Sequence, residues 1–294
     1  MLHNPITLST LFICCTFLLG TCQSSPRNRT TTLALCLVTK DQNADIREWV
    51  EYHYSIGVNN LIIFDTNSSE PCINNIRDYV TSGFVHYFYE PNYLQHGEIG
   101  LQHDLFNICL QRYSSNFSHI GFIDTDEFIV LKNNSLSVVD VLEPYKSYPG
   151  LALNSMFIGS NGHQKRPPGG VLRNYNKCVK DAHVKIIANT QLTEWNRGPH
   201  TFRHLHGALP VDTNFNPVGK PWNPGKDRIP PDSLFEVMYI NHYVIKSFED
   251  YSRKYHRGAF GIRRPMEFFN HTDLRAINDC EFLSPRKFTI KISS

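Results

Sequence analysis

Between residues 32 and 131 the chain alternates short apolar runs with longer amphipathic stretches, and this alternation limits the folds it can adopt. Each apolar run has the length of a buried strand, and each amphipathic stretch repeats its apolar residues at helical spacing. Strands that alternate with helices predict an α/β fold with a doubly wound, mostly parallel sheet and helices on both faces. The expected strands are residues 32–39, 60–66 and 84–90, together with a strand within residues 119–131 that ends at a cluster of carboxylates. The expected helices are residues 45–56, 73–82 and 98–113.

The second half of the chain is less regular, and it contains no internal repeat. One continuous domain over residues 31–285 is therefore the simplest organisation for a chain of 294 residues. Pro, Gly and Asn are frequent in one stretch, which predicts a long surface loop there. We expect strands at residues 151–159, 183–189 and 238–245, a helix at residues 247–256 and the loop at residues 206–231.

Residues 1–25 are predicted to be a signal peptide or a signal anchor rather than part of the fold. Residues 5–22 carry no charge, but a bilayer span needs about 20 apolar residues, so cleavage and retention as a membrane anchor are both open. Five N-x-[ST] sequons agree with a chain that faces the lumen of the secretory pathway. The sequons begin at Asn28, Asn67, Asn116, Asn133 and Asn270.

The charge balance and the cysteine count constrain partners and compartment. The 29 Lys and Arg residues nearly balance the 27 Asp and Glu residues, so nucleic acid is not an expected partner. An odd number of cysteines follows the leader, so an oxidising lumen would leave at least one without a partner in the chain. The sequence does not indicate which of them pair. They are Cys36, Cys72, Cys109, Cys178 and Cys280.

Three acids within four residues, Asp124, Asp126 and Glu127, follow a strongly apolar run. Carboxylates at a strand end can hold Mg²⁺ or Mn²⁺, because hard cations take oxygen ligands. Such a cation offsets the charge of a diphosphate leaving group. A solvated turn with helix-capping acids is the alternative. Ligands of doubly wound sheets bind beyond the carboxyl ends of the strands, where these acids, Thr39 and Asp65 are all expected to lie.

The chain resembles glycosyltransferase family 92 on a series of sequence blocks that contains these acids. The first block is CLVTKDQNADIREWVEYHYSIGVNNLIIFDTN at residues 36–67, and FIDTDEF at residues 122–128 carries the acidic motif. Each block alone is modestly specific, but their order along residues 36–258 is that of the family. The other matching blocks are residues 102–109, 156–163, 184–190, 198–202 and 241–258.

The resemblance implies a GT-A fold, an inverting mechanism, a UDP-sugar donor and Mn²⁺ or Mg²⁺ as cofactor. Characterised members transfer galactose to glycans in the Golgi, so a glycan acceptor and a Golgi location are expected. By position, Asp124 and Asp126 match the motif that binds metal and nucleotide, and His242 matches the histidine that completes metal coordination. Asp65 matches the position that recognises the nucleoside, and Thr39 lies beside it.

Other candidates follow from side-chain chemistry. Lys246, Lys254 and Arg257 could bind the diphosphate, and a solvated helix face is the alternative reading. Inversion by single displacement requires a base within hydrogen-bond reach of the acceptor hydroxyl.

The sequence offers three residues for this base, Glu127, Glu194 and His200, and does not choose among them. Trp195, next to Glu194, is expected in the core, with stacking on a sugar ring as the alternative.

One stretch departs from the family. Members commonly have Lys-Asn-Glu after the first strand, whereas residues 40–43 of this chain are Lys-Asp-Gln-Asn. The departure supports an alternative function, a catalytically inactive domain that binds glycans or nucleotides. A third hypothesis is a metal-dependent phosphoester hydrolase, but the sequence shows no second carboxylate cluster for a two-metal site.

Overall fold

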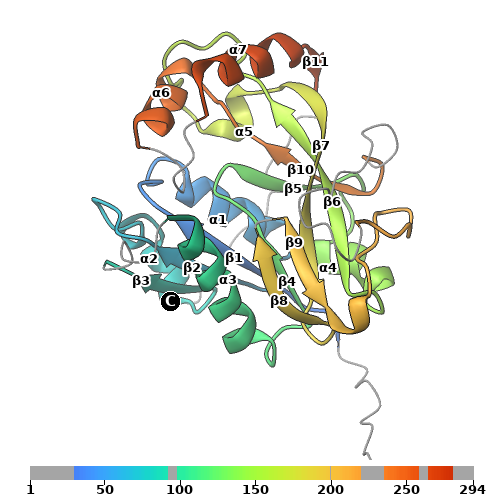
Figure 1. The fold of residues 1–294 in the computed structure, drawn as a ribbon. Helices are drawn as coiled ribbons and strands as arrows, with labels where there is room; N and C mark the ends of the chain where they lie inside the picture. Colours follow the sequence, from blue (N-terminus) through green and yellow to red (C-terminus); the bar gives the residue numbers. More distant parts are fainter. Residues whose placement is uncertain (1–29, 92–97, 199, 220–234, 258–263, 281–294) are drawn as a thin grey trace, which may run out of the picture.

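The computed structural model describes residues 30–91, 98–198, 200–219, 235–257 and 264–280 (Figure 1). The predicted leader, residues 1–25, lies outside the described residues, as does part of the predicted loop at residues 206–231. Among the described residues, no helix is both long enough and apolar enough to pass through a membrane.

Strands and helices alternate along the first half of the chain, as the sequence predicts. The elements are β1 (Leu33–Thr39), α1 (Ile46–Ser55), β2 (Asn60–Asp65), α2 (Ile73–Thr81), β3 (Val85–Tyr89), α3 (Glu98–Tyr113), β4 (His119–Phe122) and β5 (Glu127–Leu131). The strand expected to end at the acidic stretch is β4, and a second strand, β5, begins at the last acid of that stretch.

The second half of the described chain adds longer strands, a hairpin and four α-helices. The elements are α4 (Val138–Leu142), β6 (Gly150–Ile158), α5 (Val171–Asn174), β7 (Lys177–Asn189), β8 (Thr193–Gly198), β9 (Thr201–His204), β10 (Met238–His242), α6 (Phe248–Arg257), α7 (Met266–Arg275) and β11 (Asn278–Asp279). The hairpin β8–β9 forms a separate two-stranded sheet.

The main sheet has the strand order β3-β2-β1-β4-β7-β6-β10-β5, and β11 pairs with the start of β7. Strand β1 is parallel to both β2 and β4, and β2 is parallel to β3. Strand β7 is antiparallel to β4 and β6, while β10 is parallel to β6 and antiparallel to β5. The α/β class and the parallel first half are confirmed, and the second half makes the sheet mixed.

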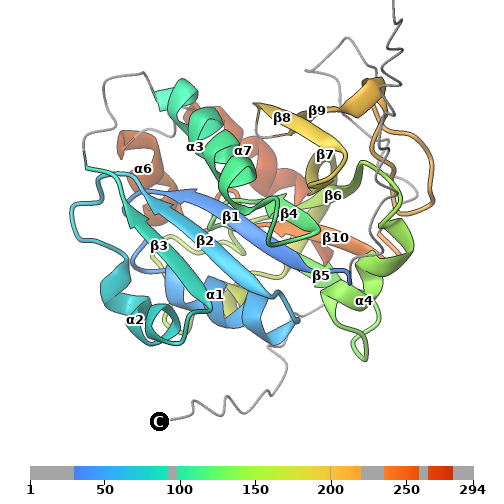
Figure 2. The same cartoon turned by 90° about the horizontal axis from the view of Figure 1, so that it is seen from below.

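Helices cover both faces of β1, which is why this strand is buried along its whole length. Side chains alternate between the two faces of a strand. Leu35 and Leu37 share a core cluster with Trp49 of α1, whereas Cys36 shares a second cluster with Phe106 of α3. Figure 2 shows α1 and α2 on one side of the sheet and α3 on the other. This two-sided burial fixes the end of β1, where the polar residues begin.

A disulfide joins Cys178 of β7 to Cys280, which follows β11. The remaining described cysteines, Cys36, Cys72 and Cys109, are buried free thiols. The odd count required at least one unpaired thiol, and the fold leaves three. The bond therefore ties the end of the described chain to the main sheet.

We expect Cys280→Ser to lower the free energy of unfolding by about 2–4 kcal/mol. The disulfide joins residues 102 positions apart, and its loss frees that segment in the unfolded chain. Urea denaturation with and without dithiothreitol measures the effect: reductant should bring the wild type down to the variant and leave the variant unchanged. Equal stability of the oxidised wild type and the variant would show that the bond contributes nothing.

Candidate functional site

A cavity of about 450 Å³ opens at the edge of the sheet where β1 and β4 end. Ligands of doubly wound sheets bind at this edge, and the volume is within the range of small-molecule sites. Lys254 and Arg257 line the cavity, together with seven of the site residues expected from the sequence. The seven are Thr39, Asp124, Asp126, Glu127, His200, His242 and Lys246.

Strand pairing brings His242 to the acidic turn between β4 and β5. Strand β10 is antiparallel to β5, so His242 at the end of β10 pairs with Glu127 at the start of β5. The backbone N–H of Tyr243 donates to the carbonyl of Asp126 at 2.7 Å, and Nε2 of His242 lies 3.5 Å from Oδ1 of Asp126. Two segments far apart in the sequence thus present their side chains to one cavity.

Glu127 holds the acidic turn together. Its side chain is 0% exposed, and Oε2 accepts the backbone N–H of Asp124 at 2.9 Å and the ammonium of Lys185 at 3.0 Å. Burial raises the pKa of Glu127, and the charge of Asp124 adds to this effect, against the opposing charge of Lys185. The other oxygen, Oε1, lies 3.4 Å from Nδ1 of His242. Because no part of the side chain is exposed, Glu127 is poorly placed to reach an acceptor hydroxyl as the predicted base.

Two lysines neutralise the paired aspartates. Nζ of Lys185 lies 2.8 Å from Oδ2 of Asp124, and Nζ of Lys254 lies 2.7 Å from Oδ2 of Asp126. Burial alone would raise the pKa of both aspartates, but the lysine charges lower both, and the pKa of Asp126 falls well below its ordinary value. Both aspartates are therefore ionised at neutral pH, which is the form that binds a cation.

The donor set of Asp124, Asp126 and His242 matches a divalent cation in kind, because it offers carboxylate oxygens and an imidazole nitrogen. Each aspartate has a second oxygen that no lysine holds: Oδ1 of Asp124 lies 3.3 Å from Nε2 of Gln102, and Oδ1 of Asp126 faces His242. In the segments that the structure describes, no group of three or more His, Cys, Asp or Glu side chains is already arranged as a metal site. At these two Oδ1 oxygens a cation would meet Gln102 and His242 rather than the lysines, which hold the Oδ2 oxygens.

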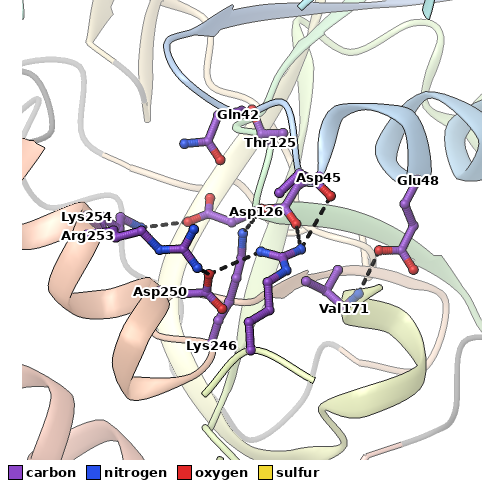
Figure 3. A network of polar contacts seen from close by, with 12 residues as sticks. Gln42, Asp45, Glu48, Thr125, Asp126, Val171, Lys246, Asp250, Arg253 and Lys254 are labelled. Atoms are coloured by element: carbon purple, nitrogen blue, oxygen red, sulfur yellow. Dashed lines mark hydrogen bonds and ion pairs between the residues drawn. The ribbon is translucent and has the colours of Figure 1, made fainter. Parts of the chain in front are cut away.

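A buried ion network lies beside the acidic turn (Figure 3). Asp45, at the start of α1, accepts hydrogen bonds from Arg166 and from Lys246. Nη1 of Arg166 also lies 3.2 Å from Oδ1 of Asp250 on α6. Burial alone would raise the pKa of Asp45, but the two cations lower it. The ammonium of Lys246 is therefore engaged by Asp45, although this lysine lines the cavity.

We expect Asp45→Asn to lower the free energy of unfolding by about 3 kcal/mol at pH 7, because it leaves the charges of Arg166 and Lys246 without their shared partner. The folded-state pKa of Asp45 lies below its unfolded value, so its contribution is full above about pH 4 and is lost as pH falls through the folded value. Urea denaturation of wild type and variant at pH 7 and pH 3 measures this change. A stability difference that stays the same at both pH values would contradict the ion-pair account.

Asp65 is fully buried and does not line the cavity. Its carboxylate accepts the backbone N–H groups of Ser68 at 3.2 Å and Cys72 at 2.8 Å, and the hydroxyl of Tyr87 at 2.6 Å. These bonds close the turn between β2 and α2. A nucleoside contact by this side chain would require one of them to break. Thr39, by contrast, lines the cavity directly.

The structure does not bring Glu194 to the cavity. Its carboxylate pairs with Arg203 across the β8–β9 hairpin at 2.6 Å. The neighbouring Trp195 is 40% exposed, so the expectation that it lies in the core is wrong. His200 does line the cavity, but its Nδ1 lies 2.8 Å from a backbone carbonyl of β7, and burial lowers its pKa to about 3. An imidazole with so low a pKa is a weak base.

Sequence reasoning missed several residues that line the cavity. Lys185 could have been found, because it lies within a predicted apolar strand and a buried lysine is rare unless it is paired. The others come from loops, from a helix face and from the irregular part of β7, where no periodic pattern singles them out. The missed residues include Gln102, His103, Arg166, His183, Lys185, Arg253 and Arg264.

Parallel strands that end at a cavity with paired acids and many cations define an α/β protein with a site suited to an anionic ligand at the carboxyl edge of its sheet. The cations that line the cavity are Lys40, Arg166, Lys185, Lys246, Arg253, Lys254, Arg257 and Arg264. The chain belongs to glycosyltransferase family 92, because the family model of that description matches residues 32–256.

Relatives from plants share this family. A glycosyltransferase family 92 protein of Oryza sativa subsp. japonica is 29% identical over 238 residues, which cover 78% of this chain and 36% of the relative. Family 92 proteins of Ricinus communis and Arabidopsis thaliana are 24% and 27% identical, and the matches cover 76% of this chain and 37% of each relative. The chain thus spans little more than a third of the length of these relatives.

Solved structures show weaker likenesses. The crystal structure of residues 1–349 of S. aureus TarS in complex with UDP matches with a TM-score of 0.36 at 14% identity, covering 54% of this chain and 47% of that chain. A glucose-1-phosphate thymidylyltransferase of Bacillus anthracis matches with a TM-score of 0.32 at 8% identity, covering 54% of this chain and 72% of that chain. TM-scores below 0.5 carry no functional assignment. The fold is defined by the strand order of the main sheet.

Proposed function

We propose that this chain is an inverting, metal-dependent glycosyltransferase domain that transfers a sugar, galactose by analogy with the family, from a UDP-sugar to a glycan acceptor. Family membership supports sugar transfer. One observation carries the donor assignment: Asp124 and Asp126 line the same cavity as eight lysine and arginine side chains, at the carboxyl edge of the sheet. A diphosphate that binds together with a divalent cation requires both signs of charge in its site.

In this proposal Asp124, Asp126 and His242 hold Mn²⁺ or Mg²⁺, which offsets the charge of the diphosphate leaving group. Lys254 on α6 is 30% exposed at its side chain, so it can turn from Asp126 to a phosphate oxygen. Lys185 is 3% exposed, so it stays on Asp124 and keeps that carboxylate ionised. The two lysines therefore have different roles: Lys254 can bind a phosphate of the ligand, and Lys185 keeps Asp124 ionised.

Arg257 holds the loop that follows β1. Its Nη1 donates to the carbonyls of Lys40 at 3.1 Å and Asp41 at 3.2 Å. The carboxylate of Asp41 accepts the N–H of Ser69 at 2.8 Å, so the loop is also tied to the turn after β2. This is the stretch that departs from the family pattern. Because it lines the cavity and is held from both sides, we propose that its backbone forms part of the nucleoside site.

We further propose that the chain acts in the lumen of the secretory pathway, in the Golgi, where a retained leader would anchor it to the membrane. The apolar leader supports this location, and so do three sequon asparagines that lie exposed on the described surface: Asn116, Asn133 and Asn270. Expression in mammalian cells followed by peptide N-glycosidase F should lower the apparent mass of the protein. An unchanged mass would contradict the lumenal location.

The function is tested by UDP binding and by turnover of UDP-sugars. Calorimetric titration of UDP with Mn²⁺ and with EDTA should give micromolar binding only in the presence of the cation. A panel of UDP-sugars, incubated with a pool of released N-glycans, should then release UDP and form a glycan that is heavier by one hexose.

Other outcomes identify the rival functions. Manganese-dependent UDP binding without transfer or hydrolysis of any sugar donor would favour the inactive binding domain. Cleavage of a phosphoester such as p-nitrophenyl phosphate, without UDP release from any UDP-sugar, would favour the hydrolase. Transfer that continues unchanged in EDTA would remove the metal from the proposal.

A further inference from the structure

Strand β7 contains a bulge at the cavity. Val184 pairs with Asn154 of β6, but the next residue of β6, Ser155, pairs with Asp181. Two residues of β7, Ala182 and His183, therefore lie outside the regular pairing with β6. Bulges bend a strand and re-aim its side chains, and they are frequent next to active sites. Here the bulge directs His183 to the cavity, which this side chain lines.

The bulge joins His183 to Asp181 as a dyad. Nδ1 of His183 is in hydrogen-bond contact with Oδ1 of Asp181, and the backbone N–H of His183 donates to the same oxygen at 2.9 Å. Burial alone would raise the pKa of Asp181, but the hydrogen bonds from His183 lower it. An ionised Asp181 favours the tautomer that has its proton on Nδ1, and Nε2 of His183 then carries a lone pair.

The ring of His183 is held in place but remains accessible. It stacks on Phe157, with centroids 5.9 Å apart and an interplanar angle of 15°, and Phe157 contacts the ring of His242 edge-on at 5.3 Å. The side chain of His183 is 40% exposed, whereas that of Asp181 is 16% exposed. The dyad thus has a shielded carboxylate behind an imidazole that is open to the cavity.

We propose that His183, oriented by Asp181, is the general base that deprotonates the acceptor hydroxyl. The assignment rests on the proposed sugar transfer. The sequence candidates lack this combination of access and orientation: Glu127 is 0% exposed, Glu194 pairs with an arginine outside the cavity, and Nδ1 of His200 is engaged by a backbone carbonyl.

The reaction step balances as a single displacement. Nε2 of His183 takes the proton of the acceptor hydroxyl as its oxygen forms a bond to the anomeric carbon of the donor sugar. The bond between that carbon and the β-phosphate oxygen breaks, and UDP leaves with the electron pair. The imidazolium that forms is stabilised by the carboxylate of Asp181 until it releases the proton to solvent.

The test compares His183→Ala, His183→Gln and Asp181→Asn with His271→Gln, which replaces an exposed histidine on α7. UDP-galactose and a pool of released N-glycans serve as substrates, and calorimetry with UDP and Mn²⁺ monitors donor binding. We expect both His183 variants to lose about 10²–10⁴-fold in kcat, with UDP affinity and thermal unfolding close to wild type. Asp181→Asn should lose about tenfold or more, and His271→Gln nothing.

Chemical rescue separates a base from a residue that only positions the acceptor. Free imidazole should raise transfer by His183→Ala at least tenfold and should leave wild type and His271→Gln unchanged, because it can enter the space vacated by the ring. Transfer by His183→Ala within threefold of wild type, or no rescue at equal UDP affinity, would overturn the assignment of the base alone. A wild-type chain that binds UDP but transfers no sugar would overturn the proposed function together with it.

Discussion

Asp126→Asn should abolish manganese-dependent sugar transfer, with turnover reduced by about a thousandfold. The substitution keeps the shape of the side chain but removes the charge that faces Lys254 at 2.7 Å and His242 at 3.5 Å. Without this carboxylate the proposed cation loses a ligand, and the diphosphate loses its counter-charge. The measurement is UDP release from UDP-galactose at the lowest Mn²⁺ concentration that saturates the wild type, with the circular dichroism spectrum as the check on folding.

The matched control for this variant is Asp104→Asn, an acid exposed on α3 that does not line the cavity. It should transfer sugar at the wild-type rate. Raising the Mn²⁺ concentration should restore part of the activity of Asp126→Asn, because Asp124 and His242 remain in place. Full turnover by Asp126→Asn at low Mn²⁺ would remove the acidic turn from the metal site and, with it, the basis of the donor assignment.

Lys185→Met should lower the free energy of unfolding by about 3–5 kcal/mol at pH 7. Lys185 is 3% exposed, and its ammonium lies 2.8 Å from Asp124 and 3.0 Å from Glu127. Burial would lower the pKa of this lysine, but the two carboxylates raise it, so the ammonium is charged in the folded protein. The variant leaves the buried Glu127 and the partly exposed Asp124, 32% exposed at its side chain, without their cation. Urea denaturation of wild type and variant measures the difference.

Two further variants test whether the buried charge is the cause. Lys177→Met removes a lysine from the same strand whose partner, Asp279, is 72% exposed, so it should change stability by less than about 0.5 kcal/mol. Adding Glu127→Gln to Lys185→Met removes one of the two carboxylate charges that have lost their lysine, and should recover part of the lost stability. A double variant that is less stable than Lys185→Met would show that shape, rather than charge, dominates at this position.

The first half of the fold was predictable because its strands and helices have clean periodic patterns and short connections. The helix expected at residues 45–56 is α1 (Ile46–Ser55), and the strand expected at residues 32–39 is β1 (Leu33–Thr39). The second half was less predictable because its order depends on pairing between distant strands. The hairpin β8–β9 contains Glu194, Trp195 and Arg203, so its strands lack the alternation of apolar and polar residues that predicts a strand.

The candidate site divides in a similar way. Acids that directly follow a strand, such as Asp124 and Asp126, are placed by the strand itself, and the structure brings them to the expected edge. Asp65 lies at the end of a strand, but its carboxylate accepts hydrogen bonds from Cys72 and Tyr87. No local sequence pattern predicts these contacts. The position of His183 depends on a bulge, where β7 has two more residues than the facing part of β6. The sequence of β7 alone does not reveal the bulge, because it is defined by pairing with another strand.

The bulge in β7 has a consequence for how the protein can vary. On both sides of it, odd-numbered residues of β6 pair with odd-numbered residues of β7: Leu153 with Lys185, and Ser155 with Asp181. Because side chains alternate with a period of two, removing or adding a pair of residues at this point would leave every neighbour on its present face, whereas a single residue would invert half the strand. The bulged segment that carries His183 can therefore gain or lose residues in pairs during evolution, while the rest of β7 keeps its pairing and its buried face.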